Sequence, residues 1–313
     1  MADAPFFIVL NAGAGSAAGA TTHRAIGDAL AAGGRAHEFM HVEDPAQLRE
    51  VAARAVAKAR ESGGVVVAAG GDGTLNAVAQ ATLGSGCPFG VIPRGTFNYF
   101  GRTHGIATDP GDAARALVSA VVHPVQVGLV NDRVFLVNAS LGLYPQSLDD
   151  REEQTTLHGR RPWVAAWAAL LTILRGYRPM RIRLDYGGVT QETRVLTLFV
   201  GNNRLQLEQV GLEKAGLVDA AQLVAVVVRP LPSLSLLWLL AKGAMRDLGG
   251  ARGVQHYGVS SLKVTPSNPR VRRIRIATDG ETVWMDTPIE FRIAPQPLLL
   301  LKPVDAVPET AAS

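Results

Sequence analysis

The chain is poor in cysteine and in aromatic residues. Its 313 residues include a single cysteine, Cys87, and Phe, Trp and Tyr together make up 6% of the sequence. One thiol excludes an internal disulfide and a zinc site built from several thiolates. We therefore expect Cys87 to be a small core residue of a protein that resides in a reducing compartment.

Long apolar runs and a strong charge of one sign are missing as well. The longest apolar segments, Trp163–Leu174 and Leu234–Leu240, are shorter than the roughly 20 residues of a membrane-spanning helix. The Phe6–Leu10 run has no basic residues before it, unlike a secretion signal. The net charge of +4 favours anionic partners only weakly and gives no argument for nucleic acid. We expect a cytoplasmic protein whose contact with the inner membrane surface, where it occurs, is peripheral.

Apolar strands alternate with amphipathic helices over residues 1–122, which is typical of a parallel, doubly wound α/β sheet. The strands are expected at Phe6–Leu10, 38–41, Val65–Ala69 and Phe89–Ile92, and the helices at Thr21–Ala32, Pro45–Arg60, after Thr74 and at Ala113–Val122. In such sheets ligands bind beyond the carboxyl ends of the strands. Polar loops that carry glycine follow three of these strands.

After residue 124 the pattern changes to mostly antiparallel strands. Met180–Tyr186 alternates strictly and is followed by Gly187-Gly188 and Thr190–Val200, which predicts a β-hairpin. Further strands are expected at Leu223–Val228, Gly258–Val264, Val271–Ala277 and Ile289–Ile293, and inserted helices at Pro162–Arg175 and Leu234–Arg246. The length of the chain likewise favours two domains.

The stretch Val65–Val78 predicts a strand, a tight glycine turn and a helix. Its turn contains Gly70, Gly71 and Gly73, which allow the backbone to approach a ligand closely. Free N–H groups and the positive end of the helix dipole make such a turn an anion site. Asp72 would repel a phosphate there unless it binds a cation, so the turn indicates a nucleotide phosphate with Mg²⁺ nearby. The alternative is an ordinary turn in which Asp72 caps the helix.

Two further loops carry candidate ligand contacts. The first, Asn11–Ser16, contains Gly13 and Gly15 and can wrap a phosphate or an adenine through its backbone; a structural turn is the alternative. The other is the loop around Gly95, Thr96 and Asn98, which offers neutral donors and acceptors suited to a nucleotide. There the alternative is an ordinary helix cap.

Several common nucleotide motifs are absent from the sequence. No Gly-Lys-Ser/Thr follows the glycines, so a Walker A loop is excluded, and the protein-kinase motifs are missing. Gly70–Gly73 does not fit the GxGxxG dinucleotide fingerprint. Gly13–Ala18 matches its opening only, because alanine stands in the last position.

Asp279, Gly280 and Glu281 lie between two expected strands. The Asp-Gly pair is typical of a hairpin turn, and a glutamate on such a turn can also act as general base for a substrate hydroxyl. The preceding strand, Arg270–Ile276, is rich in arginine. It indicates either a solvated face or a contact with anionic lipid headgroups.

Taken together, these motifs resemble the catalytic domain of the diacylglycerol kinase, sphingosine kinase and bacterial lipid kinase family. The resemblance rests on Gly70–Asn76, Ile92–Asn98, Val137–Gly142, Gly201–Asn203 and Asp279–Glu281. It implies a phosphofructokinase-like α/β domain over residues 1–123 that binds ATP, an antiparallel β-sandwich over residues 124–300 that takes the lipid, and a tail from residue 301 to 313. It also implies Mg²⁺-dependent transfer of the ATP γ-phosphoryl group to the hydroxyl of a lipid such as diacylglycerol.

The resemblance also implies roles for individual residues. ATP binding falls to Asn11, Gly13, Gly15, Ser16, Gly70, Gly71, Asp72, Gly73, Thr74, Asn76, Gly95, Thr96 and Asn98. Glu281 is the implied base, and Asp72 and Asp219 are the implied metal-side carboxylates. The chain departs from the family pattern at Tyr99, where aspartate is usual, and after Asp219, where a glycine is missing.

Two other functions fit parts of the sequence. An NAD kinase shares the glycine–aspartate motif, and a catalytically silent lipid- or nucleotide-binding protein fits the departures. The expected partner is a lipid presented by a membrane surface. The sequence leaves open whether the chain forms a homodimer. The helix that carries Trp163 and Trp167 is expected either to admit lipid at the interface or to cap the sandwich.

Overall fold

The computed structural model describes residues 4–11, 17–95, 97–142, 179–203, 207–208, 221–230 and 253–304. The chain forms two compact units. The first contains residues 1–127 and 294–313, and the second contains residues 128–293. Within the described ranges, no helix combines the length and the hydropathy needed to cross a bilayer.

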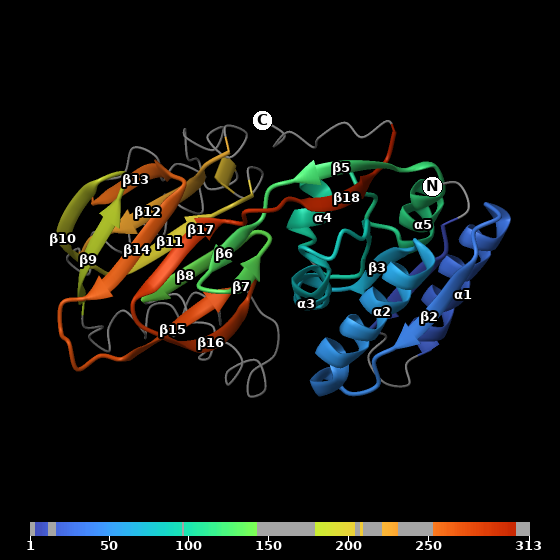
Figure 1. Cartoon of the computed structure of the whole chain (residues 1–313), viewed down its shortest axis with the longest axis horizontal. Helices are drawn as coiled ribbons and strands as arrows, with labels where there is room; N and C mark the ends of the chain where they lie inside the picture. Colours follow the sequence, from blue (N-terminus) through green and yellow to red (C-terminus); the bar gives the residue numbers. More distant parts are fainter. Residues whose placement is uncertain are drawn as a thin grey trace, which may run out of the picture. The chain divides into compact units, whose positions relative to one another are not determined.

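The first unit is built on a six-stranded sheet of order β2-β1-β3-β4-β18-β5 (Figure 1). Its strands are β1 (Phe6–Leu10), β2 (His37–His41), β3 (Val65–Gly70), β4 (Phe89–Pro93), β5 (Val121–Val125) and β18 (Leu298–Lys302). All neighbours are parallel except β18 and β5. Every residue of β1, β3 and β4 is buried, as their uninterrupted apolar sequences predict.

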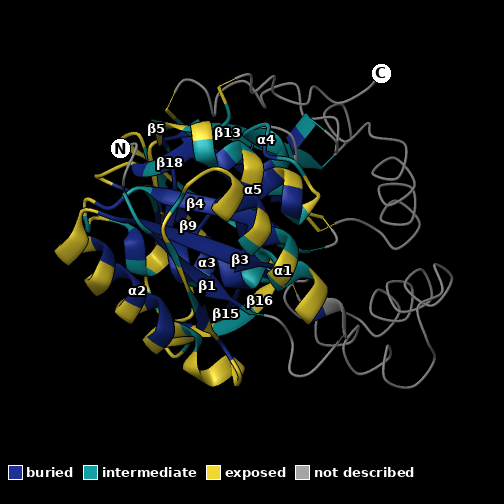
Figure 2. Ribbon diagram, turned by 90° about the vertical axis from the view of Figure 1, so that its right-hand side faces the viewer, coloured by how far each residue is buried: buried dark blue, intermediate teal, exposed yellow. Residues whose placement is uncertain are grey.

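Helices cover both faces of this sheet. They are α1 (Ala17–Ala32), the 3₁₀ turn η1 (Pro45–Gln47), α2 (Leu48–Ser62), α3 (Asp72–Thr82), α4 (Tyr99–Thr103) and α5 (Pro110–Ser119). The connection from β1 to β2 runs toward one edge of the sheet, and the connections from β2 to β3 and from β3 to β4 run toward the other edge. Because such crossovers are right-handed, α1 lies on one face of the sheet and α2 and α3 lie on the opposite face. Consistently, α1 contacts α5 and α2 contacts α3. Figure 2 shows the buried strands between helices whose outer faces are exposed. The doubly wound architecture is therefore confirmed.

The C-terminal edge of the second domain differs from our expectation. We placed residues up to 300 in the β domain, yet β18 pairs with β4 and β5 in the first unit. Leu298, Leu300 and Leu301 are at most 1% exposed. A run of four leucines needs burial on both faces, which a position inside the first sheet provides. The helix expected at Ala113–Val122 correspondingly ends at Ser119, and β5 follows it.

The second unit is an antiparallel β-sandwich, as expected. One sheet has the order β10-β9-β14-β17-β6-β7 and the other the order β13-β12-β11-β8-β15-β16. The first contains β6 (Gly128–Val130), β7 (Arg133–Phe135), β9 (Met180–Tyr186), β10 (Val189–Val195), β14 (Ser261–Pro266) and β17 (Ile289–Ile293). The second contains β8 (Asn138–Gly142), β11 (Thr197–Gly201), β12 (Leu223–Val228), β13 (Val254–Val259), β15 (Arg273–Thr278) and β16 (Glu281–Asp286). Phe135 and Phe291 from one sheet share a core with Leu141 and Ile276 from the other.

Two predicted strands are divided between the sheets. The hairpin of Met180–Tyr186 around Gly187-Gly188 is confirmed, but its second strand ends at Val195 and β11 begins at Thr197 in the other sheet. Val195 and Leu196 are both buried, which interrupts the alternation of a strand with one buried face. The strand expected at Gly258–Val264 likewise divides into β13 and β14. The helices expected at Pro162–Arg175 and Leu234–Arg246 lie outside the described residues.

Candidate functional site

The turn between β3 and α3 has the geometry of an anion site. Gly71 is the N-cap of α3 in an extended conformation, so Asp72 is the first helical residue and not the cap. Gly71 has no side chain, so the N-cap residue itself cannot accept a first-turn N–H group of α3. A Cβ atom on Gly70 would lie 2.6 Å from the Cβ atom of Thr74, which requires glycine where the strand meets the helix. Asp72 is half-buried, and its Oδ1 atom is shielded from solvent.

Residues that follow two other strands of the sheet, Asn11 after β1 and Arg94 and Gly95 after β4, contact this turn. The side-chain Nδ2 of Asn11, after β1, donates to Thr74 Oγ1 over 3.1 Å. Arg94, at the end of β4, donates from its guanidinium to the carbonyl of Asn11 (3.0 Å) and from its backbone N–H to the carbonyl of Gly70 (2.8 Å). A Cβ on Gly95 would lie 3.2 Å from Gly71 Cα, so these two glycines let the loops after β3 and β4 touch. The structure therefore brings together the loops that the sequence analysis selected separately.

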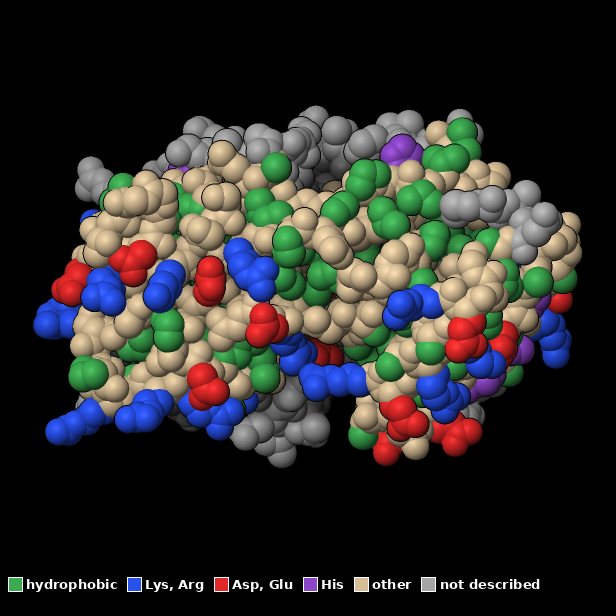
Figure 3. Space-filling view, in the orientation of Figure 1, with side chains coloured by type: hydrophobic (Ala, Val, Ile, Leu, Met, Phe, Trp, Pro, Cys, Tyr) green, Lys and Arg blue, Asp and Glu red, His purple; other side chains and the backbone are tan. Residues whose placement is uncertain are grey.

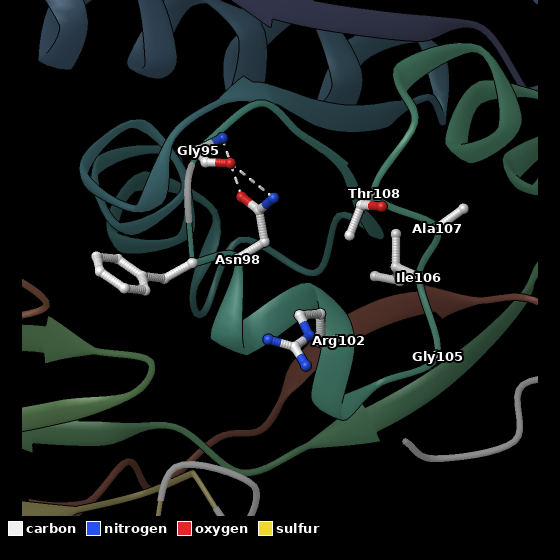
Figure 4. A pocket seen from close by; sticks show the side chains of 8 residues that line it. Gly95, Asn98, Arg102, Gly105, Ile106, Ala107 and Thr108 are labelled. Atoms are coloured by element: carbon white, nitrogen blue, oxygen red, sulfur yellow. Dashed lines mark hydrogen bonds between the residues drawn. The ribbon is translucent and has the colours of Figure 1, made fainter. Parts of the chain in front are cut away.

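Asn98 closes the third loop on itself. Its Oδ1 accepts the N–H of Gly95 and its Nδ2 donates to the carbonyl of Gly95, both over 2.9 Å (Figure 4). The residue is 6% exposed and adopts a left-handed conformation with φ of 49°. Its amide thus holds the loop in shape, a role that the residue type alone did not reveal. Asn76, in the second turn of α3, is also buried.

A pocket of about 670 Å³ adjoins this loop in the first unit (Figure 4). It is lined by Gly95, Phe97, Asn98, Arg102, Gly105, Ile106, Ala107 and Thr108. Phe97 is 59% exposed, and its ring stacks on that of Tyr99 with centroids 5.7 Å apart and planes 2° from parallel. The pocket therefore combines backbone polar groups, one guanidinium and an aromatic wall.

Asp279 and Gly280 form the turn between β15 and β16, so the hairpin-turn interpretation is confirmed. Both have positive φ, 47° and 93°, as a tight two-residue hairpin turn requires. The structure adds a contact that sequence reasoning missed. The carboxylate of Asp279 accepts the backbone N–H groups of Leu136 (2.7 Å), Val137 (2.9 Å) and Asn138 (2.9 Å).

The asparagine motifs of the second unit converge on the same backbone segment. Asn202 donates from Nδ2 to the carbonyl of Leu136 over 3.1 Å and from its backbone N–H to the carbonyl of Val137 over 2.8 Å. Gly201 lies opposite Asn138 in the ladder of β11 and β8. Residues 136–138 are thereby held from both sides, which fixes the hairpin turn that carries Glu281.

Glu281 is the first residue of β16 and lies opposite Thr278. Its Oε2 accepts a hydrogen bond from the guanidinium of Arg133 over 2.9 Å, and the two side chains are 56% and 21% exposed. An ion pair with this much solvent contact contributes little to stability. It does restrict where the glutamate carboxylate points, because its partner Arg133 is largely buried.

The structure divides the predicted site residues between the two units. Asp72 and the three loops belong to the first, and Glu281 belongs to the second. Gly13, Gly15, Ser16, Thr96 and Asp219 lie outside the described residues, as does the helix with Trp163. Among the residues that are described, no three or more His, Cys, Asp or Glu side chains gather in a way that could hold a metal ion.

Comparisons with known proteins identify relatives of this chain. Residues 5–130 match the model of the diacylglycerol kinase catalytic domain. The diacylglycerol kinase of Bacillus subtilis (strain 168) is 31% identical over 140 residues, which cover 44% of this chain and 45% of that protein. The diacylglycerol kinase of Mycobacterium tuberculosis (strain H37Rv) is 30% identical over 189 residues, covering 58% of this chain and 56% of that protein. The chain thus spans about half the length of these curated relatives.

The fold also matches a solved structure. The crystal structure of a diacylglycerol kinase from Bacillus anthracis str. Sterne superposes with a TM-score of 0.72, covering 97% of this chain and 98% of that one. The sequence identity is 20%, so this likeness shows the fold alone.

Proposed function

Because the chain belongs to the family of diacylglycerol kinases and related lipid kinases, we propose that it transfers the γ-phosphoryl group of ATP to the hydroxyl of a lipid such as diacylglycerol. The observation that carries the proposal is the contact of Asn11, Arg94 and Gly95, which follow β1 and β4, with the glycine turn that starts α3. The helix dipole and a glycine turn at the start of a helix suit a chain of phosphates better than an uncharged ligand.

In this proposal the turn at Gly70–Gly73 holds the phosphates through its backbone. Asn11, Thr74 and Arg94 fix the loops around that turn, and Asn98 fixes the loop at Gly95. The pocket beside Gly95 shares three lining residues, Gly95, Phe97 and Asn98, with this loop and receives part of the nucleotide. Catalysis of phosphoryl transfer depends largely on such positioning and on charge neutralisation.

The residues at the start of α3 fit a magnesium ion. The Asp72 carboxylate provides the hard oxygen ligand that Mg²⁺ prefers, and its partly shielded position limits competition from water. When bound, the ion neutralises charge on the phosphate oxygens. Asp219, outside the described residues, is proposed as a further carboxylate on the metal side.

Glu281 is the proposed general base. Its carboxylate accepts the proton of the lipid hydroxyl while the hydroxyl oxygen forms a bond to the γ-phosphorus and the bond from that phosphorus to the bridging oxygen of ADP breaks. Arg133 directs the carboxylate through the 2.9 Å hydrogen bond, and Asp279 anchors the turn beneath it. The lipid is met at the membrane surface, so the association with the bilayer is peripheral.

The test is ADP release by the full-length chain with ATP and Mg²⁺ on addition of diacylglycerol, a sphingoid base or NAD. We expect release with diacylglycerol. Release with NAD alone would instead identify an NAD kinase, and no release with any acceptor would favour a catalytically silent binding protein. The Asp72→Asn variant is the matched control: it should fold as the wild type does, by circular dichroism, and release no ADP.

A further inference from the structure

The hairpin of β15 and β16 presents one exposed tryptophan among arginines, and the proposed chemistry does not use them. Trp284 is 55% exposed and lies opposite Arg275, and Arg273 lies opposite Asp286. Successive side chains of a strand point to opposite faces. These four therefore share the face of the sheet that points away from the sandwich core, into which Ile274 projects.

Positive charge dominates at the end of this hairpin remote from its turn. Arg270 and Arg272 are exposed immediately before β15, and Arg273 follows them. One acidic side chain lies beside these arginines: the Oδ1 of Asp286 is 3.6 Å from the Nε of Arg273. The nearby Asp132 is balanced by Arg292, 3.4 Å away. Elsewhere, acidic and basic side chains are interspersed over the face shown in Figure 3.

We propose that the outer face of the β15–β16 hairpin, with Arg273, Arg275 and Trp284, together with the exposed Arg270 and Arg272 that precede β15, is the surface by which the protein docks on an anionic membrane. Tryptophan is enriched at the membrane–water interface because its ring is apolar and its N–H is polar. Arginines near the bilayer are attracted to anionic headgroups. Here the tryptophan and the arginines lie side by side on the two neighbouring strands of the hairpin.

The position of this surface favours a lipid bilayer as the occupant. The Arg275–Trp284 pair lies three residue steps from the Thr278–Glu281 pair, about 10 Å along the strands. A bilayer in contact with Trp284 would thus lie near the end of the strand that carries Glu281, although the Glu281 side chain alternates to the opposite face of the sheet. The choice of a lipid surface rests in this respect on the proposed function, although the docking can be measured without any turnover.

The experiment is sedimentation of the full-length chain with vesicles of phosphatidylcholine alone and with vesicles that also contain phosphatidylglycerol. We expect binding only to the anionic vesicles and a decline with added salt. Arg270→Gln combined with Arg272→Gln should weaken binding about fivefold per arginine, roughly twenty-five-fold together. Trp284→Ala, made in the wild-type chain, should also weaken vesicle binding but should leave its salt dependence unchanged.

Matched controls come from the other sheet of the sandwich. Arg181→Gln combined with Arg194→Gln removes two exposed arginines from β9 and β10, and Val189→Ala trims an apolar side chain that is 52% exposed. These variants should bind like the wild type. Equal losses in test and control variants would overturn the proposal, because they would indicate a general charge effect.

Two further results would also overturn it. One is binding that does not depend on the anionic lipid. The other is a wild-type dimer in size-exclusion chromatography that Trp284→Ala converts to a monomer, since β16 is an edge strand and could instead pair with a second copy. Vesicle binding through this face without ADP release would contradict the proposed kinase activity and leave the docking surface standing.

Discussion

Replacing Asp279 by alanine takes the acceptor away from three backbone N–H groups at once. Those of Leu136, Val137 and Asn138 all donate to this carboxylate over 2.7–2.9 Å. Hydrogen bonds to a charged group contribute about 1.5–3 kcal/mol each, and shared acceptors are not additive, so we expect a loss of about 3–5 kcal/mol in the free energy of unfolding.

The backbone conformation adds a second, separable effect. Asp279 has a φ of 47°, which disfavours alanine by about 1–2 kcal/mol but does not disfavour glycine. Asp279→Gly should therefore be less destabilised than Asp279→Ala, although both lose the carboxylate. The difference between the two variants measures the backbone term, and their common loss measures the hydrogen bonds.

Urea unfolding and native-state hydrogen exchange provide the measurement. Exchange of the amides of residues 136–138 should accelerate more than that of amides in β9. Asp132→Ala, which removes a fully exposed carboxylate from the β6–β7 turn, serves as control and should leave the urea midpoint unchanged. Unchanged exchange at residues 136–138 in Asp279→Ala would refute the anchoring role, because the three N–H groups would then not depend on this side chain.

Three further predictions follow from the geometry. Glu281→Gln should lose most of the ADP release while isothermal titration shows unchanged ATP affinity, since the amide cannot accept the hydroxyl proton; unchanged turnover would remove the base role. Gly70→Ala should lower stability by about 1–3 kcal/mol, because its Cβ would lie 2.6 Å from that of Thr74, and a melting temperature equal to that of the wild type would contradict this. Burial of the His104 imidazole, and to a lesser degree the positive charge of Lys302, lowers the pKa of His104 from 6.5 to about 3. The unfolded chain therefore binds the extra proton between these pH values, so stability should fall as the pH drops below 6.5; His104→Gln should flatten that acid limb, and identical pH profiles would show that another group is responsible.

The sequence predicted the first unit well where local pattern and tertiary role coincide. The apolar run before Gly70 and the three glycines after it have few interpretations other than a buried strand and a tight turn. The Asp279-Gly280 turn could likewise be predicted from the sequence, because a two-residue hairpin turn with positive φ at both positions favours an Asp-Gly pair. In these segments the local chemistry and the global fold favour the same structure.

The missed features depend on partners far away in the chain. The carboxylate of Asp279 binds N–H groups more than 140 residues earlier, and Asn202 binds the backbone of residues 136 and 137 more than 60 residues earlier. The transfer of the chain between sheets at Leu196 is marked only by two consecutive buried apolar residues. Neither periodicity nor residue type indicates which partner such groups will find.

The strand β18 has a consequence for the synthesis of the protein. It lies between β4 and β5, and Ala294 donates its backbone N–H to the carbonyl of Val127, so the chain re-enters the first unit beside the point where it left. Residues 5–130, which match the catalytic-domain model, therefore lack one inner strand of their own sheet. On the ribosome, the first unit must therefore wait with an incomplete sheet while the whole sandwich is translated, and the sheet is completed only when residue 302 has emerged.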